Sequence, residues 1–101
     1  MKVVITERSL YRLEDTLMFY IEDLGIPQEK VLEIKNKLLL KTKSLAISPY
    51  KGQYEPYLKK LKKGHRRLIE GNFKIIYRLD KEIVYVTDFF DSRKSPSSMR
   101  G

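Results

Sequence analysis

The chain has 101 residues, of which 42% are apolar, which is enough for one domain with a modest core. It contains no cysteine, which excludes disulfides and thiol chemistry, and no apolar run approaches the roughly 20 residues that a membrane-spanning helix needs. A net charge of +8 favours a polyanionic partner, either nucleic acid or an acidic protein. The first residues become charged too soon for a secretory signal peptide, so we expect a cytoplasmic protein.

The first half predicts a short strand and two helices. A β-branched run at residues 3–5 indicates the strand, and Thr6 is suited to cap the helix that follows. The apolar residues of this helix recur at spacings of three and four until Gly25: Leu10, Leu13, Leu17, Tyr20, Ile21 and Leu24. Pro27 suits the first position of a second helix. The apolar residues of that helix are Val31, Ile34, Leu38 and Leu45. The short connection predicts an antiparallel helical hairpin.

The second half predicts strands. Residues 57–61 are compatible with a short strand, and residues 65–69, 73–79 and 83–90 predict three more, with turns at Gly71-Asn72 and Asp80-Lys81. The order β-α-α-β-β-β indicates an α+β domain in which the helices lie on one face of a mostly antiparallel sheet. We expect a single domain over residues 1–94 and a short tail over residues 95–101.

Side chains of the strand at residues 73–79 alternate between two faces. The apolar face consists of Phe73, Ile75, Tyr77 and Leu79, whereas Lys74 and Arg78 point the other way. If the Gly71-Asn72 turn has two residues, His65, Arg67 and Ile69 share the face of Lys74. We therefore expect the apolar face to contact the helices and the other face to be open and cationic.

The candidate functional residues gather at this second face. The positive charges between residues 59 and 67 are Lys59, Lys60, Lys62, Lys63, Arg66 and Arg67. Such side chains bind the phosphates of nucleic acids and stabilise the charge that develops in phosphoryl transfer. His65 is the only histidine, and neighbouring cations favour its neutral form, which can act as a base. The alternative is a solvated charged surface on which His65 is an ordinary exposed strand residue.

Arg93 follows the last predicted strand, where it can reach over the open face. Asp88 and Asp91 are alternative, purely structural partners for Arg66 or Arg93. Exposed tyrosines are candidates for stacking on bases: Tyr50, Tyr54 and Tyr57. There is no glycine-rich phosphate loop and no set of side chains with metal-ligand spacing, so we expect no metal and no cofactor.

The run GHRRLIEGNFKIIYRLDKEIVYVTDFFDSRKSP, together with the strand and the helical hairpin before it, resembles the RelE/ParE superfamily of bacterial type II toxins. The patterns R-L-x-x-G-N-[FY]-[KR]-[IV]-[IL]-Y-R and D-x-R-x-x-P carry the resemblance, which covers nearly the whole chain. It implies the toxin of a toxin–antitoxin (plasmid stabilisation) pair, held by a cognate acidic antitoxin.

Members of this superfamily differ in activity. RelE-like members cut messenger RNA in the ribosome with cationic residues of the sheet, and ParE-like members poison DNA gyrase. On the ribonuclease branch, the resemblance places His65, Arg67 and Lys74 at basic sheet positions and Arg93 at the arginine after the last strand, which implies catalytic roles. Met99 stands where that branch has a tyrosine. Messenger RNA cleavage, gyrase poisoning and a non-toxic basic binding module are the three interpretations.

Overall fold

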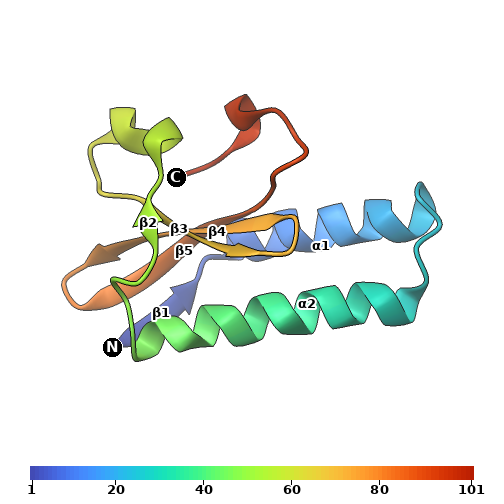
Figure 1. Ribbon diagram of the computed structural model, residues 1–101, viewed down its shortest axis with the longest axis horizontal. Coiled ribbons are helices and arrows are strands. Elements are labelled where there is room, and N and C mark those ends of the chain that lie inside the picture. Colours follow the sequence, from blue (N-terminus) through green and yellow to red (C-terminus); the bar gives the residue numbers. More distant parts are fainter.

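The computed structural model describes all 101 residues and has the predicted order of elements. Its elements are β1 (Lys2–Ile5), α1 (Glu7–Glu22), α2 (Gln28–Lys43), η1 (Ser44–Ala46), β2 (Gln53–Tyr54), η2 (Pro56–Leu61), β3 (Arg66–Glu70), β4 (Phe73–Asp80), β5 (Ile83–Asp91) and η3 (Pro96–Ser98), where η marks a 3-10 helix. Figure 1 shows α1 and α2 lying side by side as an antiparallel hairpin. No helix combines the length and the apolar character needed to cross a membrane.

Five strands form one sheet in the order β1-β5-β4-β3-β2. β1 pairs with β5 in parallel, and every other neighbouring pair is antiparallel. This arrangement confirms the expected α+β class, a helical hairpin with a mostly antiparallel sheet.

Local signals set the ends of the helices. Thr6 caps α1, because its Oγ1 accepts a hydrogen bond from the backbone N–H of Ser9 at 3.2 Å. Gly25 has a φ of +65°, a left-handed conformation that glycine adopts without steric cost, and it lets the chain turn between the helices. Pro27 lies one residue outside α2, whereas the sequence predicted that it would occupy the first position of the helix.

The main core lies between the helices and one face of the sheet. β3 pairs with β4 so that Glu70 is opposite Phe73, which leaves Gly71-Asn72 as the two-residue turn and aligns Leu68 with Ile75. Ile75 and Tyr77 are completely buried. The main core residues contributed by the helices are Leu13, Leu17, Tyr20, Val31 and Leu38. The predicted apolar face of β4 is therefore confirmed.

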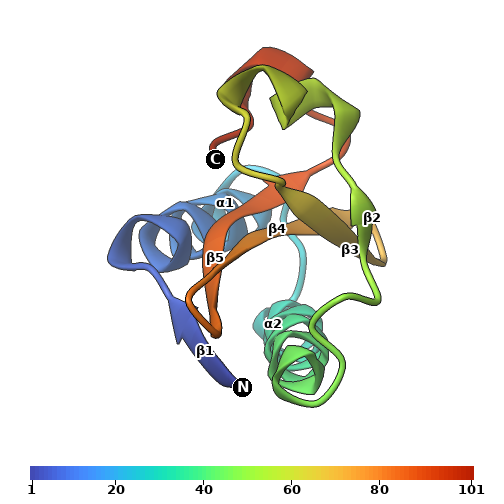
Figure 2. The ribbon, with the colours of Figure 1, turned by 90° about the vertical axis from the view of Figure 1, so that its left-hand side faces the viewer.

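The opposite face of the sheet is not open, which corrects the sequence-based expectation. Residues 57–61 belong to the 3-10 helix η2 and not to a strand. Figure 2 shows η2 and the segment after β5 above the sheet, on the side away from α2. Between these layers lies a second, smaller apolar cluster made of Leu58, Ile76, Phe90 and Met99. The segment at residues 95–101 thus packs against the domain through Met99, which is 5% exposed.

A bulge in β5 lets that strand serve both cores. Tyr77 pairs with Val86 and Ile76 pairs with Asp88, so Thr87 is an extra residue in the ladder. Because side chains alternate along a strand, the bulge places Phe89 in the main core and turns Phe90 toward the second cluster.

Candidate functional site

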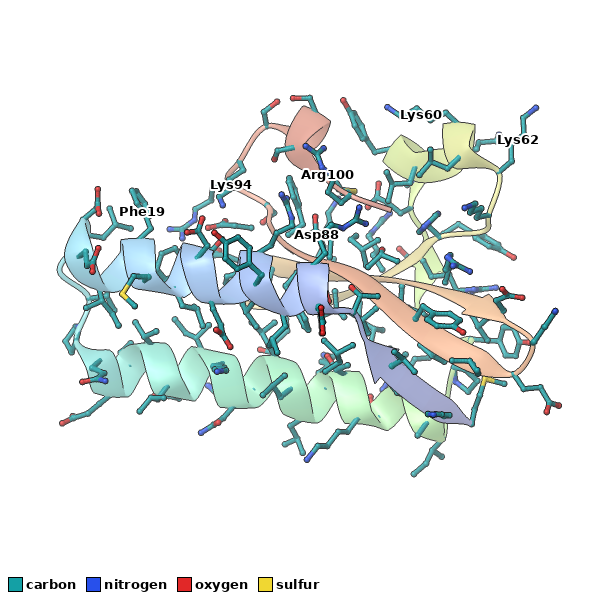
Figure 3. The ribbon with its side chains drawn as sticks, turned by 180° about the vertical axis from the view of Figure 1, so that it is seen from behind. Phe19, Lys60, Lys62, Asp88, Lys94 and Arg100 are labelled. Atoms are coloured by element: carbon teal, nitrogen blue, oxygen red, sulfur yellow. The ribbon has the colours of Figure 1, made fainter.

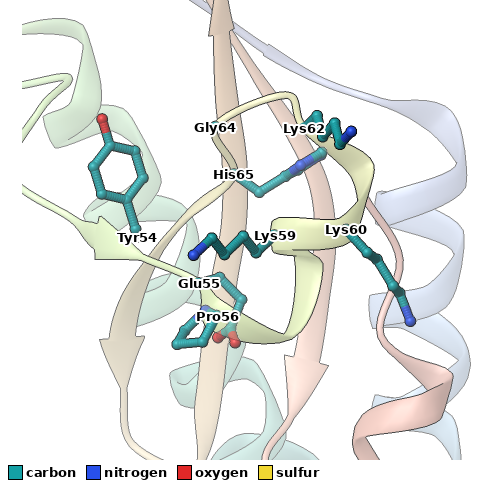
Figure 4. Close-up of a pocket in the computed structure, with 8 residues that line it drawn as sticks. All are labelled: Tyr54, Glu55, Pro56, Lys59, Lys60, Lys62, Gly64 and His65. Atoms are coloured by element: carbon teal, nitrogen blue, oxygen red, sulfur yellow. The ribbon is translucent and has the colours of Figure 1, made fainter.

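A basic hollow of about 870 Å³ lies beside η2. Its lining residues are Tyr54, Glu55, Pro56, Lys59, Lys60, Lys62, Gly64 and His65 (Figure 4). None of these three lysines takes part in an ion pair within the chain. Lys63, which precedes Gly64, is exposed as well. We call this feature the basic hollow.

The start and end of η2 explain why its lysines project from the surface. Glu55 caps η2 by accepting a hydrogen bond from Tyr57 N–H at 2.9 Å, and Pro56 begins the helix. Leu58 takes the buried side of the turn, so the lysines point outward; Figure 3 shows Lys60 and Lys62 extending away from the fold. Lys62 is left-handed at a φ of 57° and ends η2.

Glu55 is the centre of a buried polar cluster under the hollow. Its Oε1 lies 3.1 Å from Nζ of Lys74 and 3.5 Å from Nη1 of Arg67, and its side chain is 3% exposed. Arg67 also donates to the carbonyl oxygen of Tyr54 at 3.0 Å. The structure thus brings together two of the predicted catalytic residues, Arg67 and Lys74, around a carboxylate that the sequence analysis did not select.

Opposing effects act on the pKa of Glu55. Burial alone would raise the pKa of the carboxyl, but the hydrogen bond from Tyr57 N–H and the charges of Lys74 and Arg67 hold it below its usual range. Glu55 is therefore ionised at neutral pH. The two cations are shared by one anion and leave a net positive charge in the cluster.

His65 lines the hollow but is itself only 3% exposed, so the alternative that it is an ordinary exposed strand residue is wrong. Neither ring nitrogen has a hydrogen-bond partner in the chain. The imidazole packs so closely on Gly101 that a Cβ there would lie 2.8 Å from Nε2. Burial lowers the pKa of His65, and the charges of Arg78 and Lys63 lower it further. The ring is therefore neutral, as predicted, and covered.

Arg93 lies on the helix side of the sheet and does not join Arg67 and Lys74. Its guanidinium donates to both carboxylate oxygens of Asp91 at 3.1 Å and to the hydroxyl of Tyr20 at 2.5 Å. Burial and the hydrogen bond to the Asp91 carboxylate raise the pKa of Tyr20 to about 12. The arrangement is the structural Arg–Asp pair that the sequence allowed as an alternative, and it ties α1 to the end of β5.

Arg66 pairs with neither Asp88 nor Asp91, so that alternative is wrong for this residue. Its Nη1 donates to the carbonyl oxygens of Gly52 at 2.7 Å and Tyr50 at 3.2 Å. The guanidinium stacks 4.1 Å from the ring centre of Tyr54.

The dipeptide Glu55-Pro56 favours a helical turn over the short strand predicted at residues 57–61. Proline is frequent at the first position of a helix, and an acidic side chain near that end is stabilised because its carboxylate can accept from free backbone N–H groups. Reading Glu55-Pro56 in this way predicts a helical turn at residues 56–61 and places Glu55 close to the basic strand residues.

Comparison with known proteins supports the fold alone. No protein-family model matches the sequence, and no curated protein matches it. Among solved structures, the chain is similar to a chain of the "Chromosomal ParDE TA system from P. aeruginosa", with a TM-score of 0.71 and 18% sequence identity. The similarity covers 90% of this chain and 95% of the other. The chain therefore has the fold of a component of that system over nearly its whole length.

Proposed function

We propose that this chain is the toxin of a type II toxin–antitoxin pair and that it cleaves messenger RNA on the ribosome. The shared fold with a chain of the ParDE system and the sequence resemblance to RelE/ParE toxins support the toxin role. The observation that carries the reaction is the position of Glu55, between Arg67 and Lys74 and at the wall of a hollow lined by three unpaired lysines.

The cluster holds the groups that RNA cleavage requires. Attack of a ribose 2′-hydroxyl on the adjacent phosphorus forms a new O–P bond and breaks the bond to the 5′ oxygen. It needs a base for the hydroxyl proton and cations for the phosphate charge. In our proposal the phosphate draws Arg67 and Lys74 away from Glu55. The freed carboxylate then accepts the proton, and Lys74 donates a proton to the departing oxygen.

The lysines of the hollow have a different role in this proposal. Lys59, Lys60, Lys62 and Lys63 attract the RNA backbone over longer distances, so each phosphate contact adds to the salt dependence of binding. Loss of one lysine, as in Lys62→Ala, is expected to weaken binding and reduce its salt slope by about one unit without abolishing activity.

Induced expression in bacteria, combined with mapping of messenger RNA cleavage on ribosomes, tests the proposal. Glu55→Gln keeps the size of the side chain and removes the base, so it should abolish cleavage and relieve growth arrest while the protein stays folded by circular dichroism. Lys37→Ala, which removes an exposed lysine of α2, is the matched control and should remain toxic. A folded Glu55→Gln protein that still cleaves RNA and arrests growth would contradict the assignment.

The partner in this proposal is an acidic, partly disordered antitoxin. A domain of charge +8 attracts such a segment, which can fold as it binds and wrap the toxin. The association rate should fall as salt rises, because rim charges act mainly on encounter. Association with a neighbour-encoded acidic protein that is indifferent to salt would argue against electrostatic capture.

Gyrase poisoning is the second candidate. The similar solved structure is that of a ParDE system, and Arg93 lies on the helix side of the sheet, apart from the Glu55 cluster. This mechanism predicts growth arrest with inhibited DNA supercoiling and intact messenger RNA. It also predicts that Glu55→Gln remains toxic, because a protein target requires no base. Supercoiling assays with purified gyrase distinguish the two mechanisms.

A further inference from the structure

The planar guanidinium group of Arg66 is held in place beside the basic hollow, and we call it the plate. Its Nη1 atom is held by the carbonyl oxygens of Gly52 and Tyr50, so the guanidinium has little freedom to rotate. The ring of Tyr54 stacks on this plate at 4.1 Å, and the ring of Tyr50 lies 5.4 Å from it. A planar cation over an aromatic face is attractive and orients the ring.

The ring that Arg66 orients remains accessible. Tyr54 is 63% exposed although one of its faces is stacked on the guanidinium. It belongs to the lining of the basic hollow, and Figure 4 shows Lys59 extending toward the side on which Tyr54 lies while Lys60 and Lys62 extend the other way. An accessible ring held in place on the side of one free ammonium group offers both a stacking surface and a phosphate contact.

We propose that Tyr54 is a stacking platform for a base of single-stranded RNA whose backbone phosphate contacts Lys59. The inference rests on the RNA-directed function proposed above and specifies its substrate as unpaired RNA. Stacking of bases on aromatic side chains beside a positively charged groove is how proteins hold single strands. The bases of a duplex are already stacked on one another and are not free to occupy this surface.

Fluorescence anisotropy with a labelled single-stranded RNA on the order of ten nucleotides, a typical site size, tests the platform. Tyr54→Ala is expected to weaken binding about 5- to 150-fold, the effect of losing one base–aromatic stack. Tyr54→Phe keeps the ring and should bind like the unchanged protein. Tyr11→Ala is the matched control, because Tyr11 is 71% exposed on α1 and does not line the hollow; it should have no effect.

An abasic oligonucleotide of the same length separates stacking from charge. It retains the phosphates, so Tyr54→Ala should leave its binding unchanged while Lys59→Ala weakens it. The inference would be overturned if Tyr54→Ala and the unchanged protein bound the RNA with equal affinity. It would also be overturned if Tyr54→Ala weakened binding of the abasic strand as much as binding of the intact strand. These assays measure binding alone. If the protein is a toxic ribonuclease but Tyr54→Ala does not change its RNA affinity, the platform is refuted and the proposed function stands. If RNA binding depends on Tyr54 but the protein is not toxic, the proposed function is refuted and the platform stands.

Discussion

Arg12 of α1 donates from Nε to Oδ1 of Asp88 in β5 at 2.8 Å, and the Asp88 side chain is completely buried. The second oxygen of the same carboxylate accepts from the backbone N–H of Arg100 at 3.0 Å. Arg12 also donates to the carbonyl oxygen of Ser98 at 2.7 Å. Figure 3 shows Asp88 inside the fold, close to Arg100. One ion pair thus joins the first helix, the last strand and the segment that covers the second face of the sheet.

Replacing Arg12 by Ala should lower the free energy of unfolding by about 3–5 kcal/mol, because the Asp88 carboxylate then stays buried without a charged partner. Urea unfolding followed by circular dichroism measures the change. The control is Lys37→Ala, which breaks the exposed Glu33–Lys37 pair of α2 and should cost no more than about 1 kcal/mol. Equal losses for the two variants would show that Asp88 does not depend on Arg12.

His65 should make the free energy of unfolding depend on pH below about 6.5. Its pKa in the folded protein lies below the ordinary value of 6.5, so the unfolded chain binds a proton first as the pH falls. Neutral His65 therefore makes its full contribution to the free energy of unfolding above pH 6.5. This contribution is lost as the pH decreases from 6.5 through the pKa of the folded state.

Urea midpoints at about pH 7.5 and pH 5.5 test this dependence. The unchanged protein should lose stability between the two values, and His65→Leu should lose much less, because His65 is the only histidine in the chain. At pH 7.5 the substitution itself should cost little, since neither ring nitrogen has a hydrogen bond to lose. An unchanged pH dependence in His65→Leu would refute the assignment.

Gly52 lies in close contact with β3 and β4, and there is no room for a side chain at this position. A Cβ at this position would lie 2.5 Å from the hydroxyl oxygen of Tyr77 and 2.6 Å from the carbonyl oxygen of Arg67. Gly52→Ala should therefore cost about 3 kcal/mol through overpacking, and the hydrogen bond from Gly52 N–H to Tyr77 should be lost. Gly25→Ala is the comparison. That position has open space, so only its left-handed backbone opposes the change, at about 1–2 kcal/mol. Thermal unfolding should rank Gly52→Ala as the more harmful.

Ile75 of β4 and Ile69 of β3 allow the same substitution to be compared on the two faces of the sheet. Ile75 is completely buried in the main core, whereas Ile69 is 58% exposed on the other face. Ile75→Ala should lower the free energy of unfolding by about 2–5 kcal/mol, the cost of a core truncation. Ile69→Ala should change it by less than about 0.5 kcal/mol, as is usual for surface positions. Similar losses at both positions would contradict the assignment of the two faces.

The periodic parts of the chain could be predicted from the sequence alone. The spacing of Leu13, Leu17 and Tyr20 marks the buried side of α1, and the alternation of Phe73, Ile75 and Tyr77 marks the helix-facing side of β4. The Gly71-Asn72 turn then aligns β3 with β4. These predictions hold because each depends on neighbours a few residues apart, whose geometry the helix and the strand repeat without variation.

The tertiary structure alone decided what covers the second face of the sheet and which charges meet there. Leu58 lies in the short 3-10 helix η2, and Met99 directly follows η3. Both segments fold back over Ile76, and no apolar periodicity in the sequence predicts these contacts. The same return of the chain brings Glu55 to Lys74, 19 residues away, while the bulge at Thr87 and the pairing with Asp91 keep Arg93 on the helix side. Because side chains alternate along a strand, the position of a charged residue in the strand predicts the face of the sheet on which it lies. Its partner depends on loops whose path is set by the burial of a few apolar side chains, and that burial exists only once the whole domain has folded.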